Sequence, residues 1–534
     1  MKFRHSSVFL LILLLILSGC GGTNKAASHS KSGGTLIVGM ESDTDTLDPH
    51  TAGGWVTMRV TNQIFEPLIG EDLSKPSGEQ KVPKLIPVLA KSWNVSKDGK
   101  TYTFNLRKNV KFTDGTKFDA KAAVFNLRRL TDPKFKYYYK LASARVSYTW
   151  QFYKAYKLIN DYQFQIILNK PFSEFPRMLA QMRSAQMVSP AAVKKYGNTQ
   201  FGNHPVGTGP FKFQSRQRGD HITLVKNDQY WGKKAYLNKV IFKPISNSAS
   251  RTLALQNGSV DIIAVPTPDN ISKLKKQGFK EVTSTPPHVW YLTFNMNNPA
   301  MKNIKVRQAI NYAIDKNAIA ENLLKGTVKP AYTIQSPANT EFNPNKKWYS
   351  YNPEKAKQLL KEAGYSKGLS TTLLTSVDGS GQLMPADMAQ WIQRDLKKVG
   401  INVKIGTQEW ISYLTKYTEG MPKDVGMMQM SSGRTTPYWL SYIANSKFKS
   451  PNGFNAGGYS QPNLDKILDQ ATTSVNQTQS LQLWKQAEKI MMTDPGWVPI
   501  VNDTAPYILG KNVHGFINPS EEWYSLSQVW LSGK

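Results

Sequence analysis

The chain of 534 residues carries 68 Lys and Arg against 37 Asp and Glu, a formal net charge of +31. This length exceeds what a single hydrophobic core organises, so two or three domains are expected. A basic balance favours anionic partners. Because the basic residues are scattered singly or in pairs, we expect attraction to anionic lipid headgroups and wall polymers rather than to nucleic acid.

The N-terminus has the composition of an export signal. A basic region with Lys2 and Arg4 precedes an apolar run over residues 8–17. That run is about ten residues long, whereas a membrane-spanning helix needs about 20. Residues 1–19 are therefore expected to be a signal peptide rather than an uncleaved anchor, and no later segment is long and apolar enough to span a membrane.

Cys20 is the only cysteine of the chain, and it follows Leu17-Ser18-Gly19. A lone cysteine cannot form an internal disulfide. The segment resembles the lipobox of bacterial lipoproteins, in which the cysteine carries a diacylglycerol and a further acyl chain such as palmitate. Stable anchoring needs at least two chains, so we expect Cys20 to hold the protein on the outer face of the cytoplasmic membrane. Residues 20–33 are small and polar and are expected to form a flexible tether.

Periodicity and capping residues predict strands and helices along the rest of the chain. Apolar and polar residues alternate over residues 101–107, and Asp119 is placed to cap the helix that follows. Asn352 and Pro353 begin the clearest helix, and Gly364 ends it. The helix-then-strand order in this region predicts parallel α/β layering. The predicted strands cover residues 101–107, several pieces of 209–244, 261–265, 289–295, 370–376 and 401–405, and the predicted helices cover 120–129, 250–256, 268–277, 305–314, 353–363 and 385–399.

Short segments spread over nearly the whole mature chain form an ordered set, although each is weak alone. They include Gly34-Thr35-Leu36-Ile37-Val38-Gly39, Leu47-Asp48-Pro49-His50, Pro87-Val88-Leu89-Ala90-Lys91-Ser92-Trp93, Asp98-Gly99-Lys100-Thr101-Tyr102-Thr103-Phe104, Gly207-Thr208-Gly209-Pro210-Phe211, Tyr230-Trp231-Gly232, Leu292-Thr293-Phe294-Asn295, Val306-Arg307-Gln308-Ala309-Ile310 and Asn352-Pro353-Glu354-Lys355-Ala356. Together they resemble the peptide/nickel class of extracellular solute-binding proteins, called family five.

The resemblance implies an α/β, two-lobe periplasmic-binding-protein-like fold of type II, cluster C, with an extra inserted domain. It places lobe I at residues 34–70, 205–284 and 501–534, the inserted domain at 71–204, and lobe II at 285–500. Ligand would be enclosed between the lobes by hinge closure. The resemblance also implies a monomeric receptor that serves an ABC permease and uses no cofactor.

A motif typical of enzymes occurs in the sequence, but the secondary structure predicted around it is not the one that catalysis requires. Residues 364–368 fit the Gly-x-Ser-x-Gly pattern of hydrolases. A nucleophile elbow requires a strand, a turn and then a helix, whereas here the helix comes first. The histidines show no metal-ligand spacing, although His50 and His288 could meet in the cleft of such a fold, which leaves metal or metal-chelate binding as an alternative.

The aromatic segment over residues 289–295 resembles the family's crossover strand into lobe II. Alternation places Trp290 on one face with Leu292 and Phe294, and Tyr291 on the other face with Asn295. Aromatic rings with a few polar groups suit a solute pocket. Trp290 and Tyr291 are therefore candidates for the cleft, and a core position is the alternative.

The loop over residues 430–439 departs from peptide-binding relatives, which carry an Asp here that neutralises the ligand's α-amino group. Aligned on Pro437, that position falls near Gly433, and Arg434 stands beside it. Arg434 can bind a carboxylate or phosphate bidentately, or it is a solvated loop residue. An amine-dependent ligand would need another acid, for which Glu409 and Asp503 are candidates.

These features predict a solute receptor that captures oligopeptides or peptide-like solutes and catalyses no reaction. The alternatives are a non-peptide anionic or metal-chelate ligand, a surface adhesion protein, and an extracellular hydrolase. The residues expected to contact the ligand are Trp290, Tyr291, Asn295, Met430, Ser431, Ser432, Gly433, Arg434, Tyr438, Trp439 and Asn502.

Overall fold

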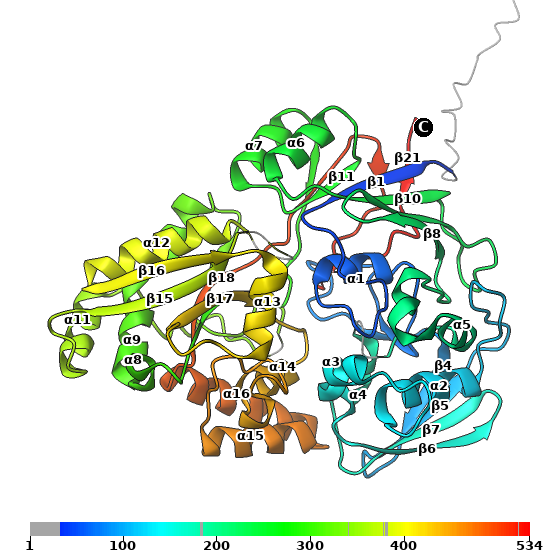
Figure 1. Cartoon of the computed structure of the whole chain (residues 1–534), viewed down its shortest axis with the longest axis horizontal. Helices are drawn as coiled ribbons and strands as arrows, with labels where there is room; N and C mark the ends of the chain where they lie inside the picture. Colours follow the sequence, from blue (N-terminus) through cyan, green and yellow to red (C-terminus); the bar gives the residue numbers. More distant parts are fainter. Residues whose placement is uncertain are drawn as a thin grey trace, which may run out of the picture.

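The computed structural model describes residues 33–181, 185–339, 341–377, 379, 383–521 and 523–533. The expected signal peptide, Cys20 and nearly all of the expected tether lie outside the described residues. Within the described residues, no helix combines the length and the apolar character needed to cross a bilayer. The described part of the chain contains three sheets of more than two strands, and helices pack on each of them (Figure 1).

A seven-stranded sheet defines the part that we call lobe I. Its strand order is β12-β19-β11-β1-β10-β9-β8, so the chain enters this sheet early and returns to it near its end. Helices α1 (Trp55–Thr61), α6 (Ser248–Gln256) and α7 (Pro268–Lys276) belong to it. The strands are β1 (Thr35–Met40), β8 (Phe211–Gln217), β9 (His221–Lys226), β10 (Lys239–Pro244), β11 (Ile262–Ala264), β12 (Lys280–Val282) and β19 (Tyr507–Leu509).

A six-stranded sheet of order β14-β18-β13-β17-β15-β16 defines lobe II. Strands β15 and β16 are parallel, as predicted, whereas β13 runs antiparallel to both of its neighbours, so the sheet is mixed. The strands are β13 (Val289–Phe294), β14 (Lys329–Pro330), β15 (Leu369–Ser376), β16 (Ile401–Gln408), β17 (Met427–Ser432) and β18 (Trp497–Asn502). The main helices are α9 (Ile304–Ala313), α11 (Pro353–Glu362), α12 (Pro385–Lys398), α13 (Trp410–Glu419), α14 (Tyr438–Ala444), α15 (Pro462–Thr473) and α16 (Gln477–Thr493).

A four-stranded antiparallel sheet of order β4-β5-β7-β6 carries a third unit, the small unit, which lies below α1 in Figure 1. A short hairpin of β2 (Ile69–Glu71) and β3 (Leu85–Pro87) precedes it in the chain. Its strands are β4 (Ala90–Val95), β5 (Thr101–Leu106), β6 (Tyr153–Asn160) and β7 (Gln163–Leu168), and its helices are α2 (Ala120–Thr131), α3 (Lys140–Trp150), α4 (Phe175–Ala180) and α5 (Pro190–Gln200).

Local signals in the sequence explain several of these elements. The carboxylate of Asp119 accepts a hydrogen bond from the Ala122 amide at 2.9 Å and caps α2, and the side chain of Asn352 caps α11 in the same way at 2.9 Å. Gly364 ends α11 with φ +88°, and β15 follows. A helix therefore precedes residues 364–368 and a strand follows them, which is the reverse of a nucleophile elbow.

The chain crosses between the lobes twice. The segment between β12 and β13 leads from lobe I to lobe II, and the segment between β18 and β19 leads back. The two segments are hydrogen-bonded to each other, because the Ser284 amide donates to the Thr504 carbonyl at 3.0 Å. A two-segment connection is the arrangement about which lobes can close on a solute.

Candidate functional site

Arg434 lies where the two lobes meet, directly after β17. Its guanidinium carbon lies 4.5 Å from the ring centre of Trp55 and 5.7 Å from that of Trp523, both of lobe I, and 5.7 Å from that of Trp439 on α14 of lobe II. Trp55 and Trp523 stack on each other with ring centres 5.4 Å apart. Such cation–π contacts contribute up to about 2 kcal/mol when water is excluded, and Arg434 is only 7% exposed.

Two buried glutamates stand in the field of Arg434. Glu71 ends β2, and Glu521 belongs to the C-terminal segment that also holds Trp523. Glu71 accepts a hydrogen bond from Arg177 of α4 at 3.0 Å, and Glu521 accepts one from the Thr435 hydroxyl at 2.6 Å. We call Trp55, Trp439, Trp523, Glu71, Glu521 and Arg434 the interlobe box.

The electrostatics of the two glutamates are linked. Burial, followed by the negative charge of Glu71, raises the pKa of Glu521 to about 8, against the opposing effects of Thr435 and Arg434. Burial also raises the pKa of Glu71, although Arg177 and then Arg434 oppose the change. A pair of close carboxylates resists double ionisation, so at neutral pH the pair retains a proton.

The loop that holds Arg434 is packed against the crossover into lobe II. A Cβ added to Gly433 would lie 1.7 Å from the carbonyl oxygen of Pro287, so only glycine fits there. His288, the next residue of the crossover, packs against Trp55 with ring centres 4.6 Å apart and ring planes tilted by 46°. The position of Arg434 is thus tied to one of the two segments that connect the lobes.

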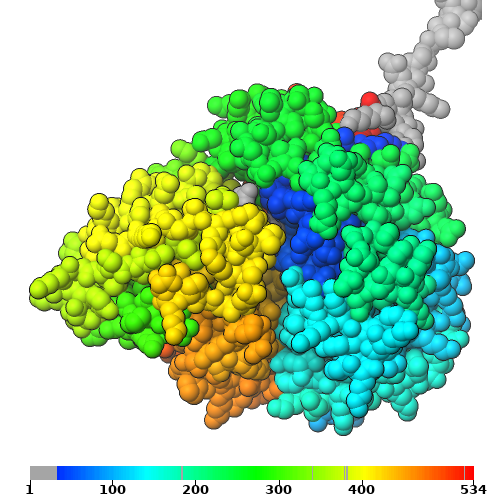
Figure 2. All heavy atoms as spheres, in the orientation of Figure 1, coloured from blue at the N-terminus to red at the C-terminus, as the bar shows by residue number. Residues whose placement is uncertain are grey.

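The small unit also contacts lobe II beside the box. The ring of Tyr438 on α14 packs on Phe172 at 4.9 Å, and its hydroxyl accepts a hydrogen bond from Gln151. The Thr436 hydroxyl donates to Glu174 at 2.8 Å. Figure 2 shows the yellow and orange segments of lobe II meeting the blue and cyan segments along a furrow. Lobe II and the small unit are therefore in contact along this boundary.

Most of the predicted ligand residues lie at the lobe boundary or next to it. Gly433, Arg434 and Trp439 lie at the lobe boundary, as does Tyr438 through its contacts with the small unit. Met430, Ser431 and Ser432 form the end of β17 next to that loop, and Tyr291 is hydrogen-bonded to Ser432.

Other predicted residues serve the core of lobe II. Trp290 is fully buried with Leu292 and Phe294, so the predicted alternation is right but a cleft role for Trp290 is wrong: its ring fills the core under the helices. The Asn295 amide donates to the carbonyls of Pro422 and Val425, and Asn502 is a paired residue at the end of β18. These two side chains are buried parts of the scaffold.

The two acids proposed from sequence as replacements have other roles. Glu409 is exposed and caps α13 by accepting from the Ile411 amide at 2.9 Å. Asp503 accepts from the amides of Thr504 and Ala505 within the return crossover. Sequence reasoning missed Trp55, Trp523, Glu71 and Glu521. A hint of two of them was present in the sequence. Two acidic residues stand next to a tryptophan at residues 521–523, in a chain that is otherwise strongly basic.

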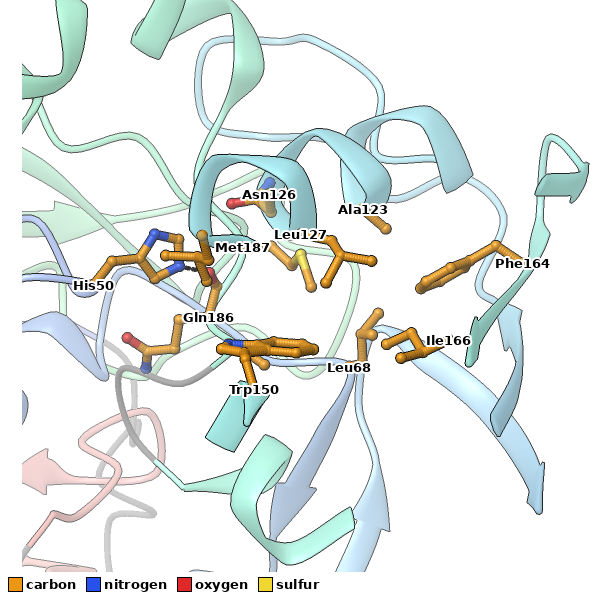
Figure 3. A pocket seen from close by; sticks show the side chains of 12 residues that line it. His50, Leu68, Ala123, Asn126, Leu127, Trp150, Phe164, Ile166, Gln186 and Met187 are labelled. Carbon is orange, nitrogen blue, oxygen red and sulfur yellow. Dashed lines mark hydrogen bonds between the residues drawn. The ribbon is translucent and has the colours of Figure 1, made fainter. Parts of the chain in front are cut away.

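Two enclosed cavities among the described residues are too small for a solute. One of about 10 Å³ lies in the small unit, with His50 at one end and Phe164 at the other (Figure 3). Another of about 10 Å³ adjoins the return crossover and is lined by residues of both lobes, including Arg59, Leu383 and Asp503. Each of these two cavities holds about one water molecule.

His50 and His288 do not come together as a metal pair. The Nε2 atom of His50 lies 2.7 Å from the Gln186 carbonyl and its Nδ1 atom lies 2.7 Å from Arg129, whereas the ring of His288 packs at a tilt against Trp55. Among the residues with assigned positions, no group of three or more His, Cys, Asp or Glu is arranged to hold a metal ion.

Comparison with known proteins identifies the family. Residues 84–452 match the family model of bacterial extracellular solute-binding proteins, family 5. The glutathione-binding protein GsiB of Escherichia coli O1:K1 is 31% identical over 494 residues, which covers 90% of this chain and 91% of the relative.

Solved structures of similar proteins have the same fold as this chain. The ABC transporter-associated periplasmic binding protein DppA from Helicobacter pylori, in complex with the peptide STSA, superposes with a TM-score of 0.85 at 27% identity, covering 94% of this chain and 98% of that one. AgaA from A. tumefaciens R10, in complex with agropinic acid, gives 0.82 at 27% identity, covering 94% and 99%. The predicted two-lobe fold is confirmed, and the chain belongs to family 5 of the bacterial extracellular solute-binding proteins, the extracytoplasmic binding components of ABC importers.

Proposed function

We propose that this protein is a lipid-anchored receptor that encloses a small peptide-like solute between its lobes and delivers it to an ABC permease. The observation that carries the proposal is the interlobe box, in which Arg434 of lobe II lies against Trp55 and Trp523 of lobe I beside two buried acids. Aromatic walls with a few convergent polar groups are the usual composition of a solute site.

The box offers complementary groups to both ends of a small zwitterion. The Arg434 guanidinium can hold a carboxylate in a bidentate pair, and the glutamates can accept hydrogen bonds from an ammonium. The loop over residues 430–439 lacks an acid, but Glu71 and Glu521 supply the negative charge from elsewhere in the sequence. A free amine is therefore compatible with Arg434, as is an N-blocked or anionic ligand that uses Arg434 alone.

The lobe boundary explains how binding is coupled to closure. The box takes residues from both lobes and from the segment before the small unit, so a solute bound there contacts all of them only when the lobes are closed. A ligand shifts the open–closed equilibrium by its differential affinity for the closed form. We therefore assign ligand capture to closure about the segments at residues 283–288 and 503–506.

The remaining assignments follow from the sequence. We propose a signal peptide at residues 1–19, acylation of Cys20, a tether over 20–33, and the domain limits given above for lobe I, the inserted domain and lobe II. The net charge of +31 would hold the monomer near anionic membrane and wall surfaces. Two acyl chains on Cys20 provide the stable anchoring that one chain does not.

A second candidate ligand is an anionic solute that is not a peptide. It is favoured by Arg434 at the centre of the box and by the likeness to AgaA, whose structure contains agropinic acid. Such a ligand would use the guanidinium and the aromatic rings, and it would leave Glu521 protonated.

Calorimetry on the purified mature protein tests the proposal. Small peptides, glutathione and acidic non-peptide solutes are titrated in free and N-acetylated forms into the wild type, Arg434→Gln and the exposed control Arg218→Gln. Charge-assisted hydrogen bonds contribute about 1.5–3 kcal/mol each, so Arg434→Gln should weaken binding by roughly tenfold or more, and the control should not. If no peptide or acidic solute binds, or if Arg434→Gln binds like the control, the proposed site is wrong.

A further inference from the structure

A polar hollow lies at one end of the four-stranded sheet of the small unit. Its volume is about 660 Å³, and it is open to solvent. Ligand pockets usually measure about 300–1,000 Å³, so the hollow is large enough for a small ligand or for one segment of a chain. It is lined by the start of β4, the end of β5 and the turn between β6 and β7, and none of its lining residues belongs to the interlobe box.

Both edge strands of this sheet are irregular where they reach the hollow. The pairing of β4 with β5 shifts at Lys91, and the pairing of β6 with β7 shifts just before Asn160, whereas the central pair β5 and β7 is regular. A β-bulge redirects the side chains beside it and is common next to binding sites. Lys91 and Asn160 both line the hollow, and they approach it from opposite edges of the sheet.

Amide side chains form an ordered row across the sheet at the same level. The Asn105 amide donates to the Ser92 hydroxyl at 3.0 Å, and the Asn105 carbonyl oxygen accepts from the Gln163 amide at 2.8 Å. Asn160 is the ladder partner of Gln163 on the next strand. An amide offers a donor and an acceptor, and a hydroxyl group of a ligand can use both. A row of amides held in place by each other is therefore suited to a ligand with several hydroxyl groups.

Lysines give the hollow a positive charge. Lys91 and Lys108 line it and are exposed, and the described residues give neither of them an ion-pair partner. Asp161 also lines it but already lies 3.9 Å from the ammonium of Lys117. The ammonium groups of Lys108 and Lys117 lie 5.7 and 4.8 Å from the centre of the Tyr162 ring, so two positive charges share one ring. An anion bound here would relieve their repulsion.

The type of basic residue favours one kind of anion. Lysine binds phosphate as a point charge, whereas the planar fork of arginine matches a planar carboxylate. Lys91 and Lys108 are the basic residues among the described lining residues, and no arginine is among them. The hollow thus combines groups for phosphate with groups for hydroxyls.

We propose that this hollow binds a segment of a polyol-phosphate chain that belongs to a wall polymer outside the membrane. The family is extracytoplasmic, and the net charge of +31 attracts such polyanions. The opening to solvent lets a longer chain continue beyond the hollow. The small unit also lies at the end of the molecule opposite to β1, the strand that follows the proposed anchor segment, so the hollow belongs to a part that is remote from the lipid (Figure 1). The site is independent of the solute proposed to bind between the lobes.

Titration calorimetry with a short oligomer of glycerol phosphate tests the inference on the whole mature protein. The proteins are the wild type, Lys91→Gln/Lys108→Gln, Gln163→Ala and the charge-matched control Lys134→Gln/Lys136→Gln, whose lysines are exposed in the same unit. Low salt is used because salt screens exposed charges. Loss of charge-assisted hydrogen bonds should weaken binding by about tenfold or more in Lys91→Gln/Lys108→Gln, and the control should bind like the wild type. Gln163→Ala should also bind more weakly.

Comparison ligands on the wild type keep the test decisive even if a variant folds poorly. Polyphosphate of equal charge has no hydroxyl groups and should bind more weakly than the oligomer. Equal binding of the two, or a folded Gln163→Ala that binds like the wild type, overturns recognition of the polyol. Equal weakening in the control overturns the site, because general charge would then explain the binding. Failure of the oligomer to bind also overturns it, and binding of phosphatidylglycerol vesicles in its place would assign the hollow to the lipid surface. Peptide binding should be unchanged in all variants, so the proposed function is tested separately.

Discussion

Glu521→Gln should change how the stability of the ligand-free protein depends on pH. Burial and the charge of Glu71 raise the pKa of Glu521 from 4.5 to about 8. The folded protein therefore retains a proton that the unfolded chain releases once the pH exceeds about 4.5. For a group whose pKa is raised by folding, the stabilisation is fully present below the unfolded pKa and is lost as the pH rises through the folded pKa.

The size of the effect follows from the shift. Each pKa unit corresponds to about 1.36 kcal/mol, so the ionisation of Glu521 removes on the order of 3–5 kcal/mol of stability between about pH 4.5 and pH 8. Glutamine keeps the shape and the contact with Thr435 but has no proton to lose. We therefore expect the wild type to lose stability across this window relative to Glu521→Gln, and the variant to be the more stable protein at pH 8.

Thermal unfolding followed by circular dichroism at several values between pH 5 and pH 8.5 measures this difference. The exposed Glu79→Gln is the control and should follow the wild type at every pH. Glu66, whose pKa burial raises to about 7, contributes a similar slope to all three proteins and cancels in the comparison. If the melting profiles of the wild type and Glu521→Gln are parallel over this range, Glu521 does not carry the buried proton and the electrostatic description of the box is wrong.

Three further changes test other parts of the structure. Gly433→Ala places a methyl group 1.7 Å from the Pro287 carbonyl and should cost about 1–3 kcal/mol or more, with a lower melting temperature and weaker ligand binding, whereas Gly78→Ala, with no atom within 4 Å, should match the wild type. Saturating ligand should reduce the radius of gyration in small-angle scattering and raise the melting temperature; an unchanged radius with tight ligand bound would contradict hinge closure. Cys20→Ser should leave uncleaved or shed protein in cell fractionation, and normal processing with membrane retention would exclude acylation at Cys20.

Elements that depend on local signals could be predicted from the sequence. The caps at Asp119 and Asn352 act within three residues of their positions, and both helices begin where these residues predict. The alternation in β13 correctly separated Trp290 from Tyr291. The sequence does not show which face of β13 packs against the helices of lobe II. The predicted cleft position of Trp290 was wrong for this reason.

The site was predicted only in the part that one segment carries. Arg434 and Trp439 lie in a loop whose departure from the family pattern was visible in the sequence. Glu71 and Glu521 are separated by most of the chain and meet only through tertiary structure, so no spacing rule relates them.

Two helices of lobe II that were not predicted also have start signals in the sequence. Pro462 is at the first position of α15, and Asn476 caps α16.

The position of β19 imposes an order of assembly on the chain. β19 lies between β11 and β12 in lobe I and is the only described strand that pairs with β12, yet it follows β18 in the sequence. During synthesis, the six strands of lobe II, at residues 289–502, are all available before β19 is made. Until then β11 has an unpaired edge and β12 cannot join the sheet, and an open edge is a template for pairing with another chain. A chain interrupted after β18 would keep every described strand of lobe II while lobe I stayed divided, so completion of the lobe that begins first depends on a strand that is made after all of lobe II.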